Sequence, residues 1–240
     1  ARTRGRHAMS TLLLRLAAPL QSWGVDAKFE NRRGTERVPT RSGVIGMIAA
    51  ALGRRRNDSI DDLQCLRFGV RVEREGVLLR DYHTVASKSP YVTHRYYLAD
   101  AVFLVGLEGD TAVLEKLDYA LGHPMFPLFL GRRSCPPEGR LSLGIRRDKT
   151  LTDAFREEPW LGGTWSPRRT LPDALRVVMD AQEGDKRVHF QRDVPLSFSQ
   201  RHRRFGFRRV SELSMPRHEN HDSNSVEAKD PTEFMSGLGE

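Results

Sequence analysis

The sequence predicts an α+β fold of the ferredoxin-like type, in which helices cover one face of an antiparallel sheet. Two observations predict it. The first half of the chain has the order strand, helix, strand, strand, helix. In that half, short apolar or alternating segments typical of strands are separated by segments with apolar residues at helical spacing. With 240 residues, the chain can bury the core of one large domain or two small ones.

The first two elements follow a short basic segment. Residues 1–8 are interpreted as a leader or a tag remnant and are left out of the fold. Residues 11–18 predict a central strand, because this mostly apolar run is too short for a helix. Residues 43–52 combine small and apolar residues and predict a buried helix, with Thr40 or Ser42 placed to cap it.

The next four elements complete the predicted sheet. Residues 67–74 alternate between apolar and basic and predict a second strand, and residues 77–83 predict a third after a glycine turn. Residues 84–95 are polar and are expected to be irregular. Residues 96–107 return to strand character, and residues 111–121 predict a helix with one apolar side.

The second half of the chain predicts a β-rich region over residues 146–215. Strand candidates lie at 175–180, 187–191 and 205–210, separated by turn-rich segments. Residues 216–240 are polar and acidic, and are expected to form a disordered tail.

Charge points to an anionic partner. The formal net charge is +8, and because residues 216–240 contribute −4, the rest of the chain carries +12. Such an excess is typical of nucleic-acid binding. No apolar run approaches the roughly 20 residues that span a bilayer, so a cytoplasmic protein without membrane contact is expected. Two cysteines are too few for a disulfide framework or a four-ligand zinc site, and neither a metal nor a cofactor is predicted.

Two glycine-containing bends carry candidate phosphate ligands. In the first, residues 39–43, Arg41 is expected to pair with phosphate while amides near Ser42 and Gly43 donate to a neighbouring oxygen. The alternative for this bend is a plain helix cap with an exposed arginine.

The second bend, residues 130–137, has the sequence LGRRSCPP. Gly131 lets the backbone approach RNA closely, Arg132 and Arg133 supply charge, and Ser134 can reach a phosphate or a 2′-hydroxyl. A tight turn with solvated arginines is the alternative.

Aromatic side chains near basic ones suggest contacts to bases. Trp23 is a candidate for stacking on an unpaired base while Gln21 reads its edge, although a tryptophan is more often part of the core. The segment around residues 80–97 mixes basic and aromatic side chains, and alternation along a strand implies that about half of them contact RNA. These candidates are Arg80, Tyr82, His83, Arg95, Tyr96 and Tyr97.

Several segments, in order over residues 10–137, resemble the CasD family of the type I-E CRISPR Cascade complex. They are LLRL (13–16), PLQSWG (19–24), PTRSG (39–43), LRDYHTV (79–85), YYLADA (96–101) and LGRRSCP (130–136). The resemblance implies an RNA-recognition-like palm over residues 9–145 with a β-hairpin thumb at about residues 80–97. The chain departs from the family pattern between Val85 and Arg95, where the thumb is expected to be shorter.

The resemblance also implies a function and partners. A member of this family holds the 5′ handle of the guide RNA without catalysis, and contacts the Cascade backbone subunit and the large subunit, with target DNA nearby. The C-terminal third matches only loosely.

Two alternative functions are chemically feasible for a chain of this charge. A metal-independent endoribonuclease would use a tyrosine or a histidine such as His83 as base, with Lys88 stabilising charge at phosphorus and His94 as the acid. A basic DNA-binding or ribosomal-type module lacks support from a helix-turn-helix or zinc signature.

Overall fold

The computed structural model describes residues 9–24, 32–85, 91–163 and 172–217. The predicted leader, Lys88 and residues 218–240 of the predicted tail lie outside the described residues.

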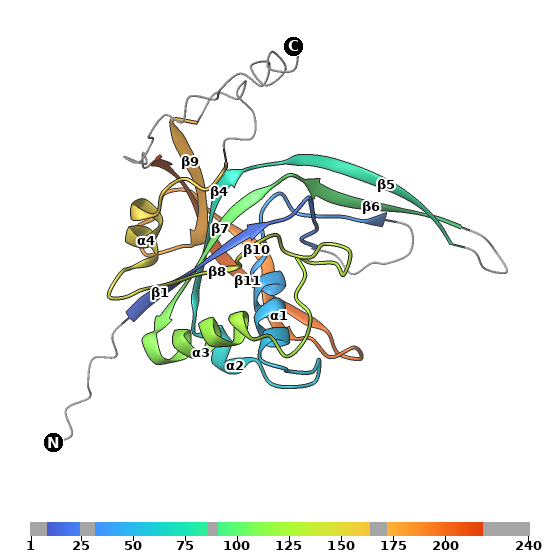
Figure 1. Ribbon diagram of the computed structural model, residues 1–240, viewed down its shortest axis with the longest axis horizontal. Coiled ribbons are helices and arrows are strands. Elements are labelled where there is room, and N and C mark those ends of the chain that lie inside the picture. The colour runs from blue at the N-terminus through green and yellow to red at the C-terminus, as the bar shows by residue number, and fades with distance from the viewer. Residues whose placement is uncertain (1–8, 25–31, 86–90, 164–171, 218–240) are drawn as a thin grey trace, which may run out of the picture.

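The described chain is a mixed α+β structure built on two sheets (Figure 1). The larger sheet has seven strands in the order β10-β11-β9-β4-β7-β1-β8, and all of its strand pairs are antiparallel. Its strands are β1 (Met9–Ala17), β4 (Arg67–Arg74), β7 (Val102–Asp110), β8 (Ser142–Arg146), β9 (Ala174–Asp180), β10 (Val188–Ser197) and β11 (Arg204–Pro216). The smaller sheet contains β2 (Leu20–Gln21), β3 (Arg32–Arg33), β5 (Val77–Val85) and β6 (Tyr91–Ala99).

The core lies on both faces of the larger sheet. On one face, α1 (Arg41–Ala51), α2 (Asp61–Gln64) and α3 (Thr111–Gly122) contribute to a cluster with Leu12, Leu14 and Leu16 of β1. On the other face, α4 (Leu151–Glu157) packs against Leu13. Strand β1 is buried on both faces, which agrees with its mostly apolar sequence and with the central strand predicted there. The sequence predicted helices on one face of the sheet only, whereas the structure has α4 on the other face as well.

The elements predicted up to residue 83 are present, and so is the helix predicted at 111–121. Thr40 caps α1, since its hydroxyl accepts a hydrogen bond of 3.2 Å from the amide of Gly43. The strand expected at 67–74 is β4, and the helix expected at 111–121 is α3. Strand β8 and helix α4 were not predicted. None of the helices in the described part of the chain is long and apolar enough to cross a membrane.

The sequence interpretation was wrong about residues 84–107. Residues 84–85 and 91–95 are not irregular, because β5 ends at Val85 and β6 begins at Tyr91, and the two strands pair from Val77↔Ala99 to Val85↔Tyr91. The single strand expected over 96–107 is two strands, β6 and β7. Asp100 separates them with a φ of 56°, a conformation that aspartate tolerates better than most residues. The β5–β6 hairpin extends away from the rest of the molecule (Figure 1).

The C-terminal strands continue the main sheet. Strand β9 pairs with β4 through Val70↔Val178, and β11 and then β10 extend the sheet beyond it. The strands predicted in this half are present, and β10 and β11 are longer than expected. This arrangement places β10 at one edge of the sheet and β8 at the other.

Candidate nucleic-acid interface

The N-terminus of α1 is occupied by the protein's own side chains. Asp193 of β10 accepts a hydrogen bond of 2.8 Å from the amide of Arg41, and the amide of Gly43 donates to Thr40. A carboxylate at a helix N-terminus satisfies the same donors that would bind phosphate. The first bend therefore binds an internal anion, Asp193, in the place where RNA phosphate was expected.

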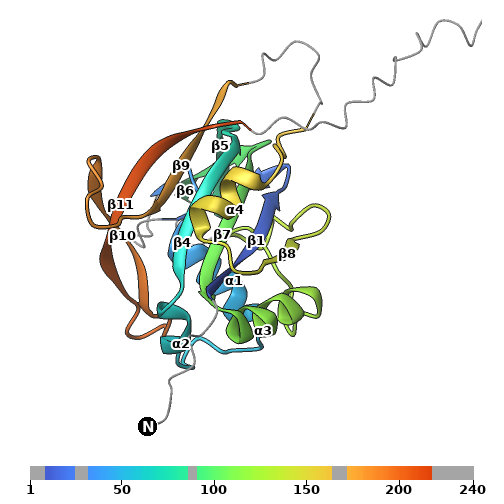
Figure 2. The same ribbon diagram turned by 90° about the vertical axis from the view of Figure 1, so that its left-hand side faces the viewer.

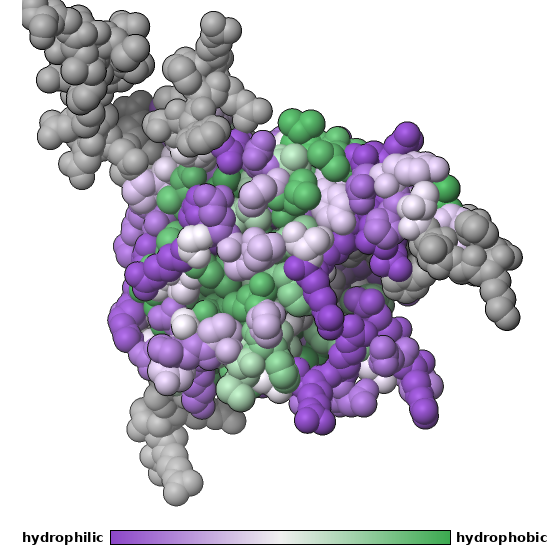
Figure 3. Space-filling view, turned by 45° about the vertical axis from the view of Figure 1, so that its right-hand side comes forward, coloured by the Kyte–Doolittle hydropathy of each residue, from purple (hydrophilic) through white to green (hydrophobic). Residues whose placement is uncertain are grey.

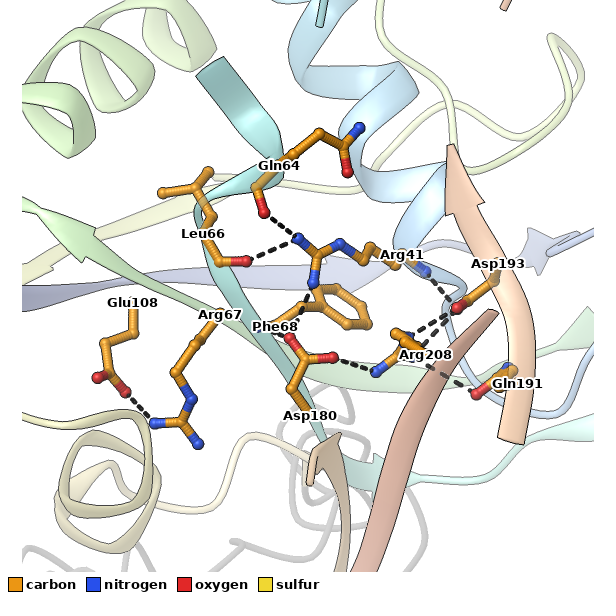
Figure 4. A network of polar contacts seen from close by, with 10 residues as sticks. All are labelled: Arg41, Gln64, Leu66, Arg67, Phe68, Glu108, Asp180, Gln191, Asp193 and Arg208. Carbon is orange, nitrogen blue, oxygen red and sulfur yellow. Dashed lines mark hydrogen bonds and ion pairs between the residues drawn. The ribbon is translucent and has the colours of Figure 1, made fainter. Parts of the chain in front are cut away.

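Arg41 itself points into the protein (Figure 4). Its guanidinium donates to Asp180 and to the carbonyls of Gln64 and Leu66, each at 2.8 Å, and the residue is 7% exposed. The prediction that Arg41 binds phosphate is wrong, because its guanidinium is buried and both of its Nη atoms already donate to partners within the protein. Ser42 is half-buried and remains a prediction.

Gln21 and Trp23 are also interior residues. Gln21 is fully buried and donates to the carbonyls of Leu16 and Ala101, while its amide oxygen accepts from the indole of Trp23 at 3.2 Å. The Trp23 ring is 1% exposed, and a Cβ added at Gly43 would lie 2.8 Å from it. The prediction of base stacking and base reading is therefore wrong for this pair. Gly43 provides space for the tryptophan.

A buried ionic network holds the first bend in place (Figure 4). Arg208 of β11 donates to Asp193 at 2.7 Å and to Asp180 at 2.8 Å, and its guanidinium lies 5.1 Å from the ring centroid of Phe68. Burial alone lowers the pKa of Arg208, but its hydrogen bonds and charge interactions with Asp193 and Asp180 raise it above the ordinary value. The network joins α1 to the C-terminal strands.

The second bend is docked against the chain after β2. Gly131 has a φ of +88°, and a Cβ added there would lie 1.6 Å from the carbonyl oxygen of Ser22. The amide of Ser22 donates to Leu130 at 3.1 Å, and a turn is closed by Cys135 donating to Arg132 at 2.9 Å. Only glycine fits this position, so the close backbone approach predicted for Gly131 is made to the protein itself.

Arg132 is held against the base of the hairpin. Its guanidinium lies 4.5 Å from the ring centroid of Tyr97 in β6, and its Nη2 donates to the carbonyl of Arg33 in β3 at 3.0 Å. Its Nη1 is buried, with no hydrogen-bond partner among the described residues. Arg133 and Ser134 next to it are exposed. The bend thus fixes one arginine and presents a second arginine and a hydroxyl.

The remaining candidate residues lie on the two faces of the β5–β6 hairpin. His83 is opposite Thr93 in the ladder, and side chains alternate along each strand, so His83 and Arg95 share the face of Tyr97. Arg80 and Tyr82 are opposite Tyr96 and His94 and lie on the other face. Tyr82 and His94 contact each other edge to face, with ring centroids 5.8 Å apart.

We define the basic loop surface as Arg33, Arg95, Arg132, Arg133 and Ser134. It combines residues from β3, β6 and the segment before β8, and it offers guanidiniums for phosphate and a hydroxyl for phosphate or sugar. Figure 3 turns the hairpin end toward the viewer and shows hydrophilic side chains projecting around an apolar middle. Arg33 was missed by sequence reasoning, because only the parallel pairing Arg33↔Arg95 brings it to this place.

The residues of the endoribonuclease alternative do not converge. His83 and His94 lie on opposite faces of the hairpin, since neighbouring ladder positions alternate. They cannot act on the same phosphate as base and acid. Within the described residues, no three His, Cys, Asp or Glu side chains are placed to hold a metal ion.

Comparisons with known proteins agree on one family. The family model for CRISPR-associated protein (Cas_Cas5) matches residues 11–211. The Cascade subunit CasD of Escherichia coli (strain K12) is 41% identical over 160 residues, which cover 56% of this chain and 70% of the relative.

Two solved structures resemble the fold over most of its length. One, described as a CRISPR RNA-guided surveillance complex, is 34% identical with a TM-score of 0.72 and covers 87% of this chain and 91% of its own. The other, a crystal structure of a Cas protein, is 43% identical with a TM-score of 0.69 and covers 86% and 95%. These matches confirm the resemblance to CasD, and the chain belongs to the CRISPR-associated Cas5 family.

Proposed function

We propose that this chain is a subunit of a Cascade-type CRISPR surveillance complex, in which it binds the 5′ handle of the guide RNA without cleaving it. The family membership and the similarity to CasD support the assembly. The observation that carries RNA binding is the docked second bend, where Arg132 is fixed on Tyr97 while Arg133 and Ser134 face solvent.

The architecture supports a path for the RNA. In this proposal, β4-β7-β1-β8 with α1 and α3 form the ferredoxin-like palm, and the β5–β6 hairpin is the thumb. The handle crosses the basic loop surface and continues along the hairpin face that carries Arg95 and His83. Arg80 and Tyr82 lie on the opposite face and are outside this path.

The arrangement is suited to holding RNA. Stacking on Tyr97 and the hydrogen bond to Arg33 order the Arg132 side chain before RNA arrives, which lowers the entropic cost of binding. Arg133 neutralises a phosphate, and Ser134 bonds to phosphate or to a 2′-hydroxyl, which distinguishes RNA from DNA. The Cascade backbone subunit, the large subunit and nearby target DNA are the proposed neighbours.

Fluorescence anisotropy with labelled handle RNA tests the site. Arg133→Ala is expected to weaken binding at physiological salt, whereas Arg156→Ala, which removes an exposed arginine from α4, is expected to leave it unchanged. Equal affinities of the two variants would remove the basic loop surface from the proposal.

Two further measurements test assembly and turnover. Co-expression with a guide RNA and the candidate partner subunits, followed by native mass spectrometry, is expected to show a ribonucleoprotein of fixed stoichiometry. Incubation with labelled precursor RNA in EDTA is expected to leave the RNA intact. Cleavage that disappears in His83→Ala would instead establish the endoribonuclease.

A further inference from the structure

Strands β10 and β11 pair as a hairpin, which we call the β10–β11 ribbon, and it exposes two phenylalanines between arginines. Phe190 is 72% exposed and Phe207 is 67% exposed. Phe190 lies directly opposite Arg209 in the ladder, and the guanidinium of Arg192 lies 6.0 Å from the ring centroid of Phe207. On the outer face of the ribbon, two aromatic rings therefore alternate with two cations.

The inner face of the same ribbon explains why these side chains point outward. Asp193 and Arg208 are buried there and belong to the ionic network with Asp180, and Val210 is fully buried in the core. Residues one position away on each strand must then face solvent. The network fixes which residues of the ribbon face inward. Both rings are on the opposite face and are therefore exposed.

The ribbon carries a net positive charge. Residues 186–209 contain eight basic residues and one acidic residue, Asp193, which pairs internally with Arg208. None of the other seven basic residues forms an ion pair with a described residue, and all seven are exposed. They are Lys186, Arg187, Arg192, Arg201, Arg203, Arg204 and Arg209. Partial burial lowers the pKa of Arg203, and repulsion by nearby Arg56 lowers it further. This repulsion is the effect of neighbouring cations.

We infer that the outer face of the β10–β11 ribbon is a second nucleic-acid site, which binds an unpaired strand through base stacking on Phe190 and Phe207 and through phosphate contacts to Arg192 and Arg209. Aromatic rings interleaved with cations are the combination that binds single strands with little sequence preference. A duplex keeps its base faces stacked internally and offers nothing to the rings. An apolar protein partner would leave the seven cations without counter-charges.

This site is separate from the basic loop surface. The basic loop surface is built on β3 and β6 of the smaller sheet and on the bend docked against Ser22, whereas β10 is an edge strand of the larger sheet. Figure 2 shows β10 and β11 on one side of the molecule and β8 on the other. The ribbon therefore binds a different segment of nucleic acid from the one proposed for the handle.

Binding of labelled oligothymidylate and oligouridylate to the full chain tests the inference. The double variant Phe190→Ala/Phe207→Ala is expected to weaken binding about five- to 150-fold for each base stack removed. Phe126→Ala, which removes a ring exposed elsewhere, is the matched control and is expected to change nothing. Both rings are exposed, so the folded state is expected to persist, and circular dichroism checks it. The two oligonucleotides show whether the strand is DNA or RNA.

Further variants separate this site from the other possibilities. Arg192→Gln/Arg209→Gln is expected to weaken binding and reduce its salt dependence. In an Arg133→Ala background the effect of the phenylalanine substitutions is expected to persist, which distinguishes the two sites. Unchanged affinity of the phenylalanine variant for both oligonucleotides overturns the inference. If that variant also fails to assemble with partner subunits, the ribbon is a protein interface.

Discussion

The carboxylate of Asp193 accepts a 2.8 Å hydrogen bond from the backbone amide of Arg41, at the N-terminus of α1. The same carboxylate accepts hydrogen bonds of 2.7 and 3.0 Å from Arg208. One side chain from β10 therefore neutralises a buried guanidinium and the positive end of a helix dipole. This contact fastens the C-terminal strands to the first helix.

Asp193→Asn is expected to destabilise the fold by about 3 kcal/mol, because it leaves the buried Arg208 without one of its two carboxylates. Urea denaturation measures the change in the free energy of unfolding. Glu115→Gln, which breaks an exposed pair with Arg147, is the control and is expected to cost less than about 1 kcal/mol. Equal unfolding midpoints for the two variants would show that the network does not stabilise the protein.

Gly131→Ala is expected to disrupt the second bend and with it the affinity for handle RNA. The new Cβ would overlap the Ser22 carbonyl, in addition to the cost of about 1–2 kcal/mol for a positive φ. Gly139→Ala is the control, because Gly139 has a φ of +67° but its nearest neighbour would be 3.6 Å away. Melting temperature and RNA affinity should fall much further for Gly131→Ala; similar losses in both variants would contradict the close approach.

The salt dependence of handle binding is expected to report the phosphate interaction of Arg133. Each phosphate that a protein neutralises on a single strand adds about 0.7 to the steepness of log affinity against log salt. Arg133→Ala should therefore give a shallower slope than the unsubstituted chain, measured by anisotropy over a salt series. A weaker affinity with an unchanged slope would assign Arg133 to an interaction other than with phosphate.

The pair between Arg176 of β9 and Glu212 of β11 predicts a pH effect on stability. The hydrogen bond from Arg176 lowers the pKa of Glu212 below its ordinary value of 4.5. The pair therefore stabilises the folded state above that value, and the contribution disappears as the pH falls through the lowered pKa.

Glu212→Gln is expected to cost less than about 1 kcal/mol at neutral pH, because both partners are partly exposed. Urea denaturation of both proteins at several pH values measures this cost. It should shrink as the pH falls below 4.5. A cost that stays constant over the acidic range would mean that the charge of Glu212 does not contribute.

Local patterns were sufficient for several elements. Thr40 as the cap of α1 and the presence of strand β4 could be predicted because helix caps and strand patterns depend on neighbouring residues. The boundary at Asp100 was missed because both sides of it are strand-like and only its backbone conformation marks the turn. Strand β8 and helix α4 are short, and their sequence signals are correspondingly weak.

The sequence by itself determined the excess of positive charge, the order of the first elements, the glycine at the second bend and the resemblance to the family. The tertiary structure alone decided which candidate residues are accessible. The guanidinium of Arg41 is buried against Asp180, 139 residues further along the chain, while Asp193 occupies the N-terminus of its helix. Arg132 is fixed at the base of the hairpin because it stacks on Tyr97, and Arg133 beside it is exposed. The charge of a side chain and the presence of a glycine can be read from the sequence. Whether a side chain can reach a ligand depends on contacts that form only when distant parts of the chain fold together.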